Sequence, residues 1–310
     1  MSEPAPRRTR RAVDGLLLLD KPSGITSNAA LQRVKWLFQA RKAGHTGSLD
    51  PLASGMLPIC FGEATKFAGY LLDADKTYRV QARFGARTDT GDADGTVVET
   101  AARVPIRLTE LEQGVASLRG PIQQVPPMYS ALKQQGQRLY ALARAGREVP
   151  REPRPVHIYE FAIEAFDPVT PEFRVRCSKG TYIRTLIEDL AGRLGSLAHV
   201  AALRRLAVEP FGGQGMLTLE QLEAAVGSGA EPDRAALDAL LRPLEAVLPD
   251  WPSVELDVAS ALRVSQGGRI VAPRGVEVGL VRLYAPGRRF LGVGELRADG
   301  LLGPHRLIAR

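Results

Sequence analysis

The chain has 310 residues, of which 45% are hydrophobic and 24% charged, a composition typical of a folded globular protein rather than a disordered one. Lysine and arginine outnumber aspartate and glutamate by 41 to 34, and the net charge of +7 favours a polyanionic partner such as nucleic acid. Two distant cysteines and four scattered histidines give neither a disulfide framework nor a metal-binding spacing. No apolar run approaches the roughly 18 residues of a membrane-spanning helix, so we expect a cytoplasmic protein with no membrane partner. The first residues are rich in arginine, and we expect a basic, flexible tail over residues 1–13.

The first apolar run, Gly15–Leu19, predicts a short buried strand. We expect a helix after it, capped by Ser27 and ending before Gly44. A second helical stretch is predicted from Gly62 through Leu72. The apolar face of the first helix is formed by Leu31, Val34, Leu37 and Phe38.

The segment Gly44–Pro58 combines three glycines, two prolines, one histidine and one carboxylate, with almost no periodicity. Proline fixes φ, and Pro51 also favours an extended conformation at the preceding Asp50. The pattern predicts a shaped loop that holds Asp50 in one orientation. The alternative is an ordinary connection in which Asp50 only accepts hydrogen bonds within a turn.

Residues 76–85 alternate in polarity, which predicts a strand with Tyr78 on its apolar face and Arg79 on a wet, basic face. Residues 88–95 superficially resemble a calcium loop. An alignment with such a loop places Ala101 where a bidentate glutamate is needed, so we interpret the segment as an acidic turn.

Residues Pro121–Pro155 are rich in proline, glutamine and basic side chains, around a short helical core at Leu139–Ala145. A long connection of low apolar content is typical of a functional loop or a mobile segment. Its aromatic and basic side chains could stack on RNA bases and grip the RNA backbone, whereas the alternative is a solvated excursion. These side chains are Tyr129, Lys133, Arg138, Tyr140, Arg144, Arg147, Arg151 and Arg154.

A strand is predicted around Phe173–Cys177, followed by a turn and a helix from Ile183 that ends at Gly195. Arg184 lies in the first turn of this helix, where exposed amides favour anions and disfavour cations. A basic residue at this place suggests a purpose, such as pairing a carboxylate or a phosphate.

The last part of the chain differs in character. We expect a surface break inside a helical region at residues 227–233. Residues 253–310 are short strand-like pieces separated by glycine and proline, which predicts a small, mostly β second domain with a boundary near residue 250.

Several of these segments resemble the signature of the TruB family, the tRNA pseudouridine-55 synthases. The resemblance runs in the same order from about Gly15 to Ala207, and several long matches in series are highly specific. Ser48 and Ser54 stand where close relatives would have Ala and Thr. The matching motifs are Leu18–Gly24, Gly44–Pro51, Gly62–Lys66, Thr88–Thr90, Tyr129–Lys133 and Ser178–Arg184.

The resemblance implies an α+β fold. A pseudouridine synthase catalytic domain over residues 14–250 would be built on a mixed, largely antiparallel sheet, with residues 121–155 as a mobile thumb. A small, mostly β, PUA-like RNA-binding domain would follow over residues 251–310. The implied activity is that of an isomerase, which converts uridine at position 55 in the T loop of tRNA to pseudouridine without cofactor or metal. The partner would be the T arm of tRNA, and we expect a monomer that requires no protein partner.

By resemblance, Asp50 is the catalytic nucleophile. It attacks C6 of the base or C1′ of the ribose, or promotes loss of a ribose proton, and the sequence leaves these routes open. Burial alone would raise the pKa of this carboxyl, and Arg184 is the family's guanidinium partner that offsets the effect. Lysine would be a poor substitute, because the planar guanidinium fork can bind both carboxylate oxygens.

The resemblance also places residues around the target uridine, which must leave its stack to reach Asp50. Tyr78 stacks on the base and its hydroxyl helps to remove the C5 proton, while Leu203 contacts the opposite side of the base. Either residue could otherwise be ordinary core. His45 helps to hold the rearranged T loop. The remaining substrate-binding residues are Tyr182, Lys21 and Lys66, the lysines as phosphate or cleft-lining groups.

Two other classes of function compete with this interpretation. A tRNA-binding or tRNA-folding chaperone would share the basic surface without requiring Asp50 or Arg184, and both are present. An enzyme that acts on a small glycoside would normally have two carboxylates flanking the bond, and Asp50 has no obvious acidic partner in its own loop.

Overall fold

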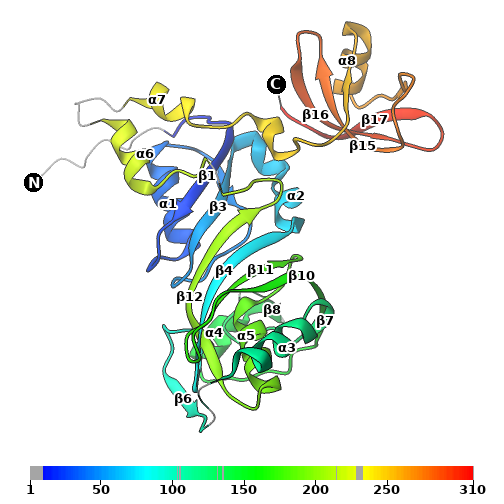
Figure 1. Ribbon diagram of the computed structural model, residues 1–310. Coiled ribbons are helices and arrows are strands. Elements are labelled where there is room, and N and C mark those ends of the chain that lie inside the picture. Colours follow the sequence, from blue (N-terminus) through cyan, green and yellow to red (C-terminus); the bar gives the residue numbers. More distant parts are fainter. Residues whose placement is uncertain are drawn as a thin grey trace, which may run out of the picture.

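The computed structural model describes residues 10–309 except 103, 105, 131, 135, 214 and 228–232. The chain forms a large α+β unit around an eight-stranded sheet and a smaller, mostly β unit around a five-stranded sheet (Figure 1). The predicted α+β class is confirmed. Most of the predicted N-terminal tail and most of the predicted break at 227–233 lie outside the described residues.

The large sheet tests the prediction of a mixed, largely antiparallel sheet. Its strands are β1 (Gly15–Lys21), β2 (Ala43–His45), β3 (Ser54–Phe61), β4 (Lys76–Phe84), β7 (Gly120–Gln124), β10 (Arg154–Ala165), β11 (Glu172–Cys177) and β12 (Ala198–Val208). Their order is β1-β3-β12-β4-β11-β10-β7, with β2 beside β3. The β3–β12 pair is parallel and the other pairs are antiparallel, which confirms a mixed, largely antiparallel sheet.

Helices and two short strand pairs complete the large unit. The helices are α1 (Ser27–Leu37), η1 (Gly62–Lys66), α2 (Ala68–Asp73), α3 (Leu108–Ser117), α4 (Leu139–Arg144), α5 (Ile183–Arg193), α6 (Leu219–Val226), α7 (Arg234–Ala239) and η2 (Leu244–Val247), of which η1 and η2 are 3-10 helices. The short pairs are β5 (Ala86–Thr88) with β6 (Val97–Thr100), and β8 (Lys133–Gln134) with β9 (Gln137–Arg138). In the described part of the chain, no helix is both long and apolar enough to cross a membrane.

Strand β1 is buried on both faces. Leu17 and Leu19 pack in one core with residues of α1 and α6, whereas Leu16 and Leu18 pack in another core with residues of η1 and α2. A strand that is covered on both sides requires apolar side chains at successive positions, which explains the leucine run.

Strand β4, in contrast, has one buried and one exposed face. Tyr78 and Val80 share a core cluster with residues of α3 and α5, while Arg79 and Arg83 point the other way and are exposed. Helices α3 and α5 lie together over this half of the sheet (Figure 1). The predicted alternation over residues 76–85 is confirmed.

Two helix predictions are wrong in detail. The N-cap of α1 is Thr26, whose side chain accepts a hydrogen bond from the Ala29 amide, so Ser27 is already the first helical residue. The predicted helix from Gly62 is instead η1 followed by α2. The Thr65 hydroxyl donates to the Gly62 carbonyl at 2.7 Å, a local bond that competes with continuous α-helix.

The loop around Asp50 is shorter than the predicted Gly44–Pro58, because β2 ends at His45 and β3 begins at Ser54. Pro58 lies inside β3, where its carbonyl accepts from the Thr46 amide at 3.0 Å. The proline and glycines hid this strand from the sequence pattern, since both residue types are depleted in strands.

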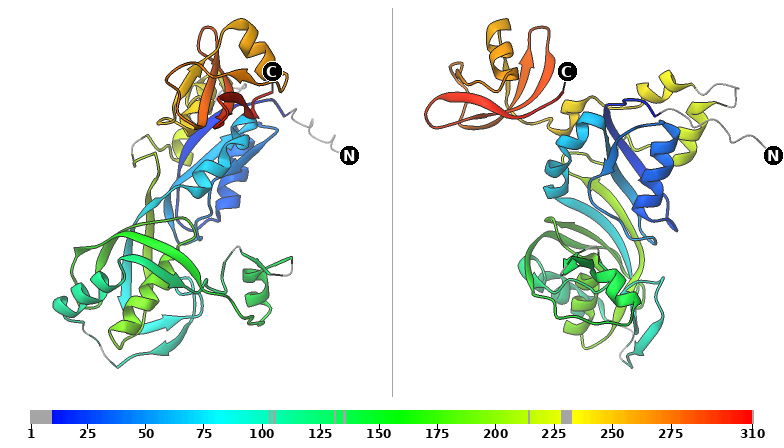
Figure 2. Two further views of the ribbon diagram at one scale, coloured as in Figure 1. Left: turned by 90° about the vertical axis from the view of Figure 1, so that its right-hand side faces the viewer. Right: turned by 180° about the vertical axis from the view of Figure 1, so that it is seen from behind.

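The excursion predicted over Pro121–Pro155 is shorter too, because β7 and β10 occupy its two ends. The short helical core is present as α4. In the left view of Figure 2 the segment that contains α4 stands out from the body. Arg151 donates to the Pro126 carbonyl and contacts Glu148, so it braces the base of this segment. The side chains of Lys133, Arg138 and Arg144 lie outside the described residues.

The C-terminal unit is mostly β, as predicted. It contains β13 (Ser253–Glu255), α8 (Val258–Ser265), β14 (Ile270–Val271), β15 (Gly279–Ala285), β16 (Arg289–Leu296) and β17 (Leu301–Leu307), in the sheet order β13-β15-β16-β17-β14. It packs directly on the large unit, since the ring centroids of Phe290 and Phe67 are 5.8 Å apart. Both rings belong to the core cluster that includes η1 and α2.

Candidate active site

The Asp50 loop is fixed from both sides by buried polar groups. The Ser27 hydroxyl accepts from the Leu49 amide at 2.7 Å and lies 3.0 Å from the Leu49 carbonyl. On the other side of Asp50, the Lys21 ammonium lies 3.4 Å from the Pro51 carbonyl and donates to the carbonyls of Pro22 and Ile25. These bonds hold the backbone on either side of the carboxylate.

Arg184, at the start of α5, points its guanidinium at Asp50. Arg184 Nε lies 3.0 Å from Asp50 Oδ2, and Nη2 lies 3.3 Å from Oδ1. The two contacts form a fork on both carboxylate oxygens, which a single ammonium could not reproduce. The Arg184 side chain is 5% exposed and that of Asp50 39%, so the carboxylate remains open to a ligand.

Three further groups fix the guanidinium of Arg184. Nη1 donates to the Thr90 carbonyl at 2.6 Å, and Nη2 donates to the Tyr129 carbonyl at 2.7 Å. Asp92 Oδ2 lies 3.8 Å from Nε, and the Thr90 hydroxyl donates to the other Asp92 oxygen at 2.6 Å. The arginine therefore joins three segments that are far apart in the sequence, one of which is the excursion after β7.

Asp92 is a site residue that the sequence interpretation missed. The acidic turn was identified, but nothing in the pattern showed which carboxylate is turned inward. The Asp92 side chain is 6% exposed and makes the second carboxylate contact of Arg184. The available signal was the family motif Thr88–Thr90 immediately before it.

The pKa of Asp50 depends on burial and on two nearby charges of opposite sign, those of Arg184 and Asp92. Burial raises the pKa of this carboxyl above its ordinary value, the Arg184 guanidinium opposes the shift, and the nearby Asp92 charge adds to it. The offset by arginine that the sequence predicted is therefore present but incomplete.

Tyr182 is the N-cap residue of α5, immediately before the arginine turn. The Gln124 side chain accepts from its amide at 2.7 Å and donates to its carbonyl at 3.0 Å. This clamp joins the end of β7 to the start of α5. The structure thus brings Tyr182 next to Arg184 and gives its backbone a positioning contact.

Tyr78 and Leu203 lie on neighbouring strands, β4 and β12. Leu203 pairs in register with Val80, two residues from Tyr78, so both side chains share one face of the sheet. Tyr78 is 9% and Leu203 8% exposed, and both belong to the core cluster that contains Leu49 of the Asp50 loop. The sequence-predicted pair is thus placed beside the Asp50 loop.

Arg205, two residues after Leu203, was not singled out from the sequence. It is 1% exposed, and its guanidinium donates to the Met56 carbonyl at 2.6 Å and the Gly47 carbonyl at 3.0 Å. Its backbone approaches β3 so closely that a Cβ at Gly55 would lie 2.2 Å from the Arg205 carbonyl oxygen. Glycine is therefore required at position 55, where φ is +101°.

The other predicted contacts have different surroundings. His45, on β2, is half-buried and its pKa is lowered by burial and by the Arg205 charge. Lys66 donates to Glu63 and to the Leu307 carbonyl at 2.9 Å, which ties η1 to the C-terminal unit. Lys21 is fully buried. Its carbonyl bonds support a role in loop structure, and the predicted phosphate or cleft-lining role stays a prediction.

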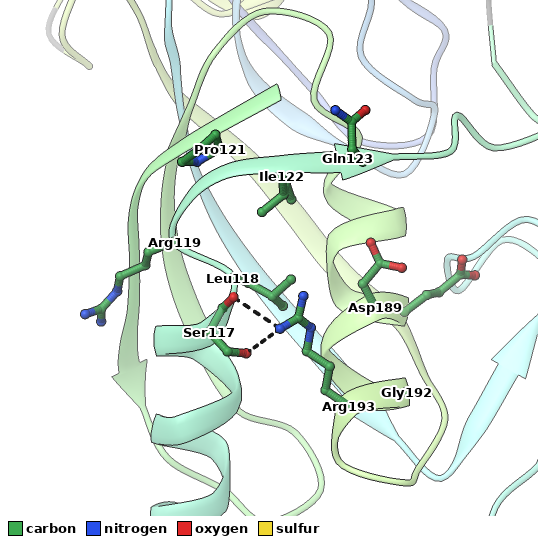
Figure 3. A pocket seen from close by; sticks show the side chains of 10 residues that line it. Ser117, Leu118, Arg119, Pro121, Ile122, Gln123, Asp189, Gly192 and Arg193 are labelled. Atoms are coloured by element: carbon green, nitrogen blue, oxygen red, sulfur yellow. Dashed lines mark hydrogen bonds between the residues drawn. The ribbon is translucent and has the colours of Figure 1, made fainter. Parts of the chain in front are cut away.

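A cavity of about 710 Å³ lies between α3, β7 and α5 (Figure 3). Across it, Arg193 donates to the carbonyl and hydroxyl oxygens of Ser117, at 3.1 and 2.8 Å. Its lining does not include Asp50, Arg184 or Tyr78. The residues that line the cavity are Ser117, Leu118, Arg119, Pro121, Ile122, Gln123, Glu188, Asp189, Gly192 and Arg193.

Among the described residues, no group of three or more histidine, cysteine, aspartate or glutamate side chains is placed to hold a metal ion.

Family models match most of the chain. Residues 35–183 match the TruB family pseudouridylate synthase N-terminal domain, and residues 184–249 match the tRNA pseudouridylate synthase B C-terminal domain. Residues 252–308 match the C-terminal model of pseudouridine synthase II TruB.

Similar proteins extend over almost the whole chain. A tRNA pseudouridine synthase B of Stutzerimonas stutzeri is 52% identical over 97% of this chain and 98% of its own length. One from Methylobacillus flagellatus is 51% identical, with 97% of each chain covered.

Solved structures support the fold. A protein chain in an H/ACA RNP bound to a substrate RNA containing 2′-deoxyuridine has a TM-score of 0.72 at 22% identity, covering 96% of this chain and 85% of that one. A chain of a Cbf5-Nop10-Gar1 complex has a TM-score of 0.70 at 26% identity, covering 91% and 78%.

Proposed function

Because the chain belongs to the TruB family of pseudouridine synthases, we propose that Asp50 is the carboxylate with which it isomerises uridine to pseudouridine in tRNA, and that the target uridine lies in the T loop. The family and the near full-length similarity establish the isomerase activity on tRNA. The catalytic residues, the position in tRNA and the assembly state are the proposal.

The reaction breaks the bond between N1 and C1′ and makes a bond between C5 and C1′, while C5 loses a proton and N1 gains one. A charged carboxylate beside the sugar and the base can act on C6, on C1′ or on a ribose proton. The observation that carries the proposal is the two-point contact of Arg184 with Asp50, at 3.0 and 3.3 Å. It orients an ionised carboxylate that is still partly exposed.

The proposed base contacts come from the strands beside the Asp50 loop. The target uridine has to leave its stack, which costs a few kcal/mol and requires a surface on which the base can lie. Tyr78 and Leu203 project from the same face of the sheet, and both pack against the core that contains Leu49. We assign Tyr78 to stacking and to removal of the C5 proton, and Leu203 to the opposite side of the base.

Binding of the rest of the tRNA is assigned to the basic surface, to the segment that contains α4, acting as a thumb, and to the C-terminal unit as a PUA-like domain. The net charge of +7 supports phosphate contacts. Arg184 bonds the Tyr129 carbonyl, so the thumb and the catalytic pair are directly linked. We also propose that the protein acts on tRNA as a monomer in the cytoplasm.

The decisive experiment uses tRNA labelled with tritium at C5 of uridine, because pseudouridine formation must release that tritium. Wild-type protein should release about one equivalent per tRNA and Asp50→Asn none, while tRNA binding stays nearly unchanged because it depends mostly on phosphate contacts. Asp250→Asn, in an exposed turn between the two units, is the matched control and should behave as wild type. Mapping the product to a T-loop uridine tests the site.

Four results would each contradict a part of the proposal. Loss of tRNA binding together with activity in Asp50→Asn would mean that Asp50 serves binding or structure. Full tritium release by Asp50→Asn would remove it from the chemistry. A product mapped outside the T loop would overturn the assignment of the target while leaving Asp50 in place. No release by wild type, with tRNA bound, would instead favour the chaperone alternative.

A further inference from the structure

Arg205 places a charge in the dry layer beneath the active site. Its side chain is among the largest that are fully buried, and its guanidinium contacts the carbonyls of Met56 and Gly47. In the described part of the chain, no ion pair joins Arg205 to a carboxylate. Buried charges are normally paired, because desolvation of a lone ion is costly. An uncompensated guanidinium therefore projects its field onto whatever polar group lies beside it.

The group beside it is Tyr78. Arg205 and Tyr78 are register partners on β12 and β4, so their side chains leave the sheet on the same face. The other titratable groups that influence the Tyr78 hydroxyl are Asp50 and Cys177. The Arg205 charge also acts on Lys21, His45 and Lys76 of neighbouring elements. Arg205 and the two lysines therefore outnumber the one carboxylate, Asp50, among these groups.

Burial and the guanidinium act on Tyr78 in opposite directions. Burial raises the pKa of the phenol above its ordinary value, and Arg205 opposes this shift through its charge and a hydrogen bond. A phenol can take a proton from carbon only in its ionised form. Without the guanidinium, burial alone would make that form still rarer at neutral pH.

We propose that Arg205 is a positioning residue for the proton-removal step, in which its charge stabilises the phenolate of Tyr78 that accepts the C5 proton. The inference rests on the proposed function, in which Tyr78 performs this step. The intermediate carries both the ribose and a hydrogen on C5. The phenolate oxygen takes that proton, the C–H electron pair forms the C5–C6 double bond, the electron pair of the C6–N1 double bond returns to N1, and N1 takes a proton from water.

A purely structural role for Arg205 makes a different prediction. Its bonds to Gly47 and Met56 fix the first part of the Asp50 loop to β3, so their loss would displace Asp50 and slow cleavage of the N1–C1′ bond. Under the proposed role, loss of Arg205 slows a later step, the loss of the C5 proton. Deuterium at C5 separates the two, because only breakage of the C5–H bond responds directly to it.

The test compares variants of the full chain under single-turnover conditions, on tRNA carrying hydrogen or deuterium at C5 of uridine. Arg205→Gln removes the charge, and Arg205→citrulline removes the charge but keeps the planar N–H donors. Both should be slowed about 100-fold, the scale of a general base, and should show a primary isotope effect that wild type lacks. Their rates should rise about tenfold per pH unit from pH 7 to 9, as the phenolate fraction grows. Arg205→Lys, which keeps a charge, should recover most of the rate and lose the isotope effect.

Tyr78→Phe shows which idea fails if the results differ. Tritium release at the wild-type rate by Tyr78→Phe would overturn both the role of Tyr78 and this inference. If Tyr78→Phe is impaired but Arg205→citrulline is fast, or slow with no isotope effect, only the inference is overturned. The ¹³Cζ signal of Tyr78, identified by its loss in Tyr78→Phe, should titrate at higher pH in Arg205→citrulline than in wild type. An unchanged titration would contradict the proposal even if Arg205→Gln does not fold.

Discussion

The proposed active site has two layers that use cations differently. At its mouth, Arg184 contacts the carboxylates of Asp50 and Asp92 as well as two carbonyls. At its base, Arg205 and Lys21 donate to backbone carbonyls. A cation on a carboxylate orients a reacting group directly. A cation on carbonyls holds the backbone that carries that group, and Arg205 in addition acts on Tyr78. The two layers should therefore respond differently to substitution.

The largest expected effect is at the mouth. Arg184→Lys keeps the charge but loses the fork on Asp50 and the bonds to Thr90 and Tyr129, so single-turnover activity should fall about 100-fold with tRNA affinity nearly unchanged. Arg79→Lys is the matched control, because Arg79 pairs with Glu164 at 2.6 Å on the exposed face of β4. Turnover near the wild-type level in Arg184→Lys would show that fork geometry does not matter.

The sequence pointed to Asp50 and Arg184 at the mouth but not to Arg205 at the base, for a physical reason. Asp50 and Arg184 lie in motifs with unusual local chemistry, a glycine- and proline-rich loop and a cation in the first turn of a helix. Arg205 lies in a basic, alternating strand, where an inward arginine has the same appearance as an outward one. Its partners, Gly47 and Met56, contribute backbone oxygens, and a carbonyl contact leaves no trace in residue types.

The fold was predictable to a similar degree. The strand buried on both faces, Gly15–Leu19, and the half-buried strand over residues 76–85 were both predicted correctly. Strand β3 was not, because Gly55 and Pro58 interrupt its pattern although each has a specific place in the sheet. The predicted cap of α1 is one residue too late. Serine often caps helices, but the Ser27 hydroxyl bonds Leu49 across the fold, and Thr26 is the cap.

The second largest effect is expected at the base, on stability. Lys21→Met preserves volume but leaves the carbonyls of Pro22 and Ile25 without their donor, so the free energy of unfolding should fall by about 1–3 kcal/mol. Burial lowers the pKa of Lys21 from 10.5 to about 8, so the folded state binds fewer protons than the unfolded state between these values. Wild type should therefore gain stability over Lys21→Met as pH rises from 8 to 10.5.

Denaturant unfolding at several pH values measures both parts of this prediction. Lys35→Met, on the more exposed surface of α1, is the control and should change little at any pH. A Lys21→Met protein as stable as wild type at pH 7 would show that Lys21 does not hold the loop.

A smaller effect is expected on the pH dependence of activity. Burial raises the pKa of Asp50 and the Asp92 charge adds to the shift, so activity should begin to fall at a pH above the ordinary carboxyl range. Asp92→Asn removes that charge, and the acid limb of the pH–rate profile should move to lower pH. Asp94→Asn, an exposed position in the same turn, is the control. An acid limb that stays in place in Asp92→Asn would separate Asp92 from the titration of Asp50.

The smallest expected effect tests whether the charge of Asp50, at the mouth, lowers the stability of the fold. Because the folded pKa of Asp50 is raised, the folded state favours the neutral acid, and stability is lost as pH rises through that pKa. Asp50→Asn cannot ionise and should unfold at a temperature about 1–2 °C higher than wild type at pH 7, which corresponds to roughly 0.5 kcal/mol in a domain of this size. The difference should disappear below about pH 3, where the carboxyl is neutral in both states. Calorimetry at pH 3 and pH 7 measures this. A lower melting temperature for Asp50→Asn at pH 7 would mean that the contact with Arg184 stabilises the fold, and that the mouth and the base are not distinct after all.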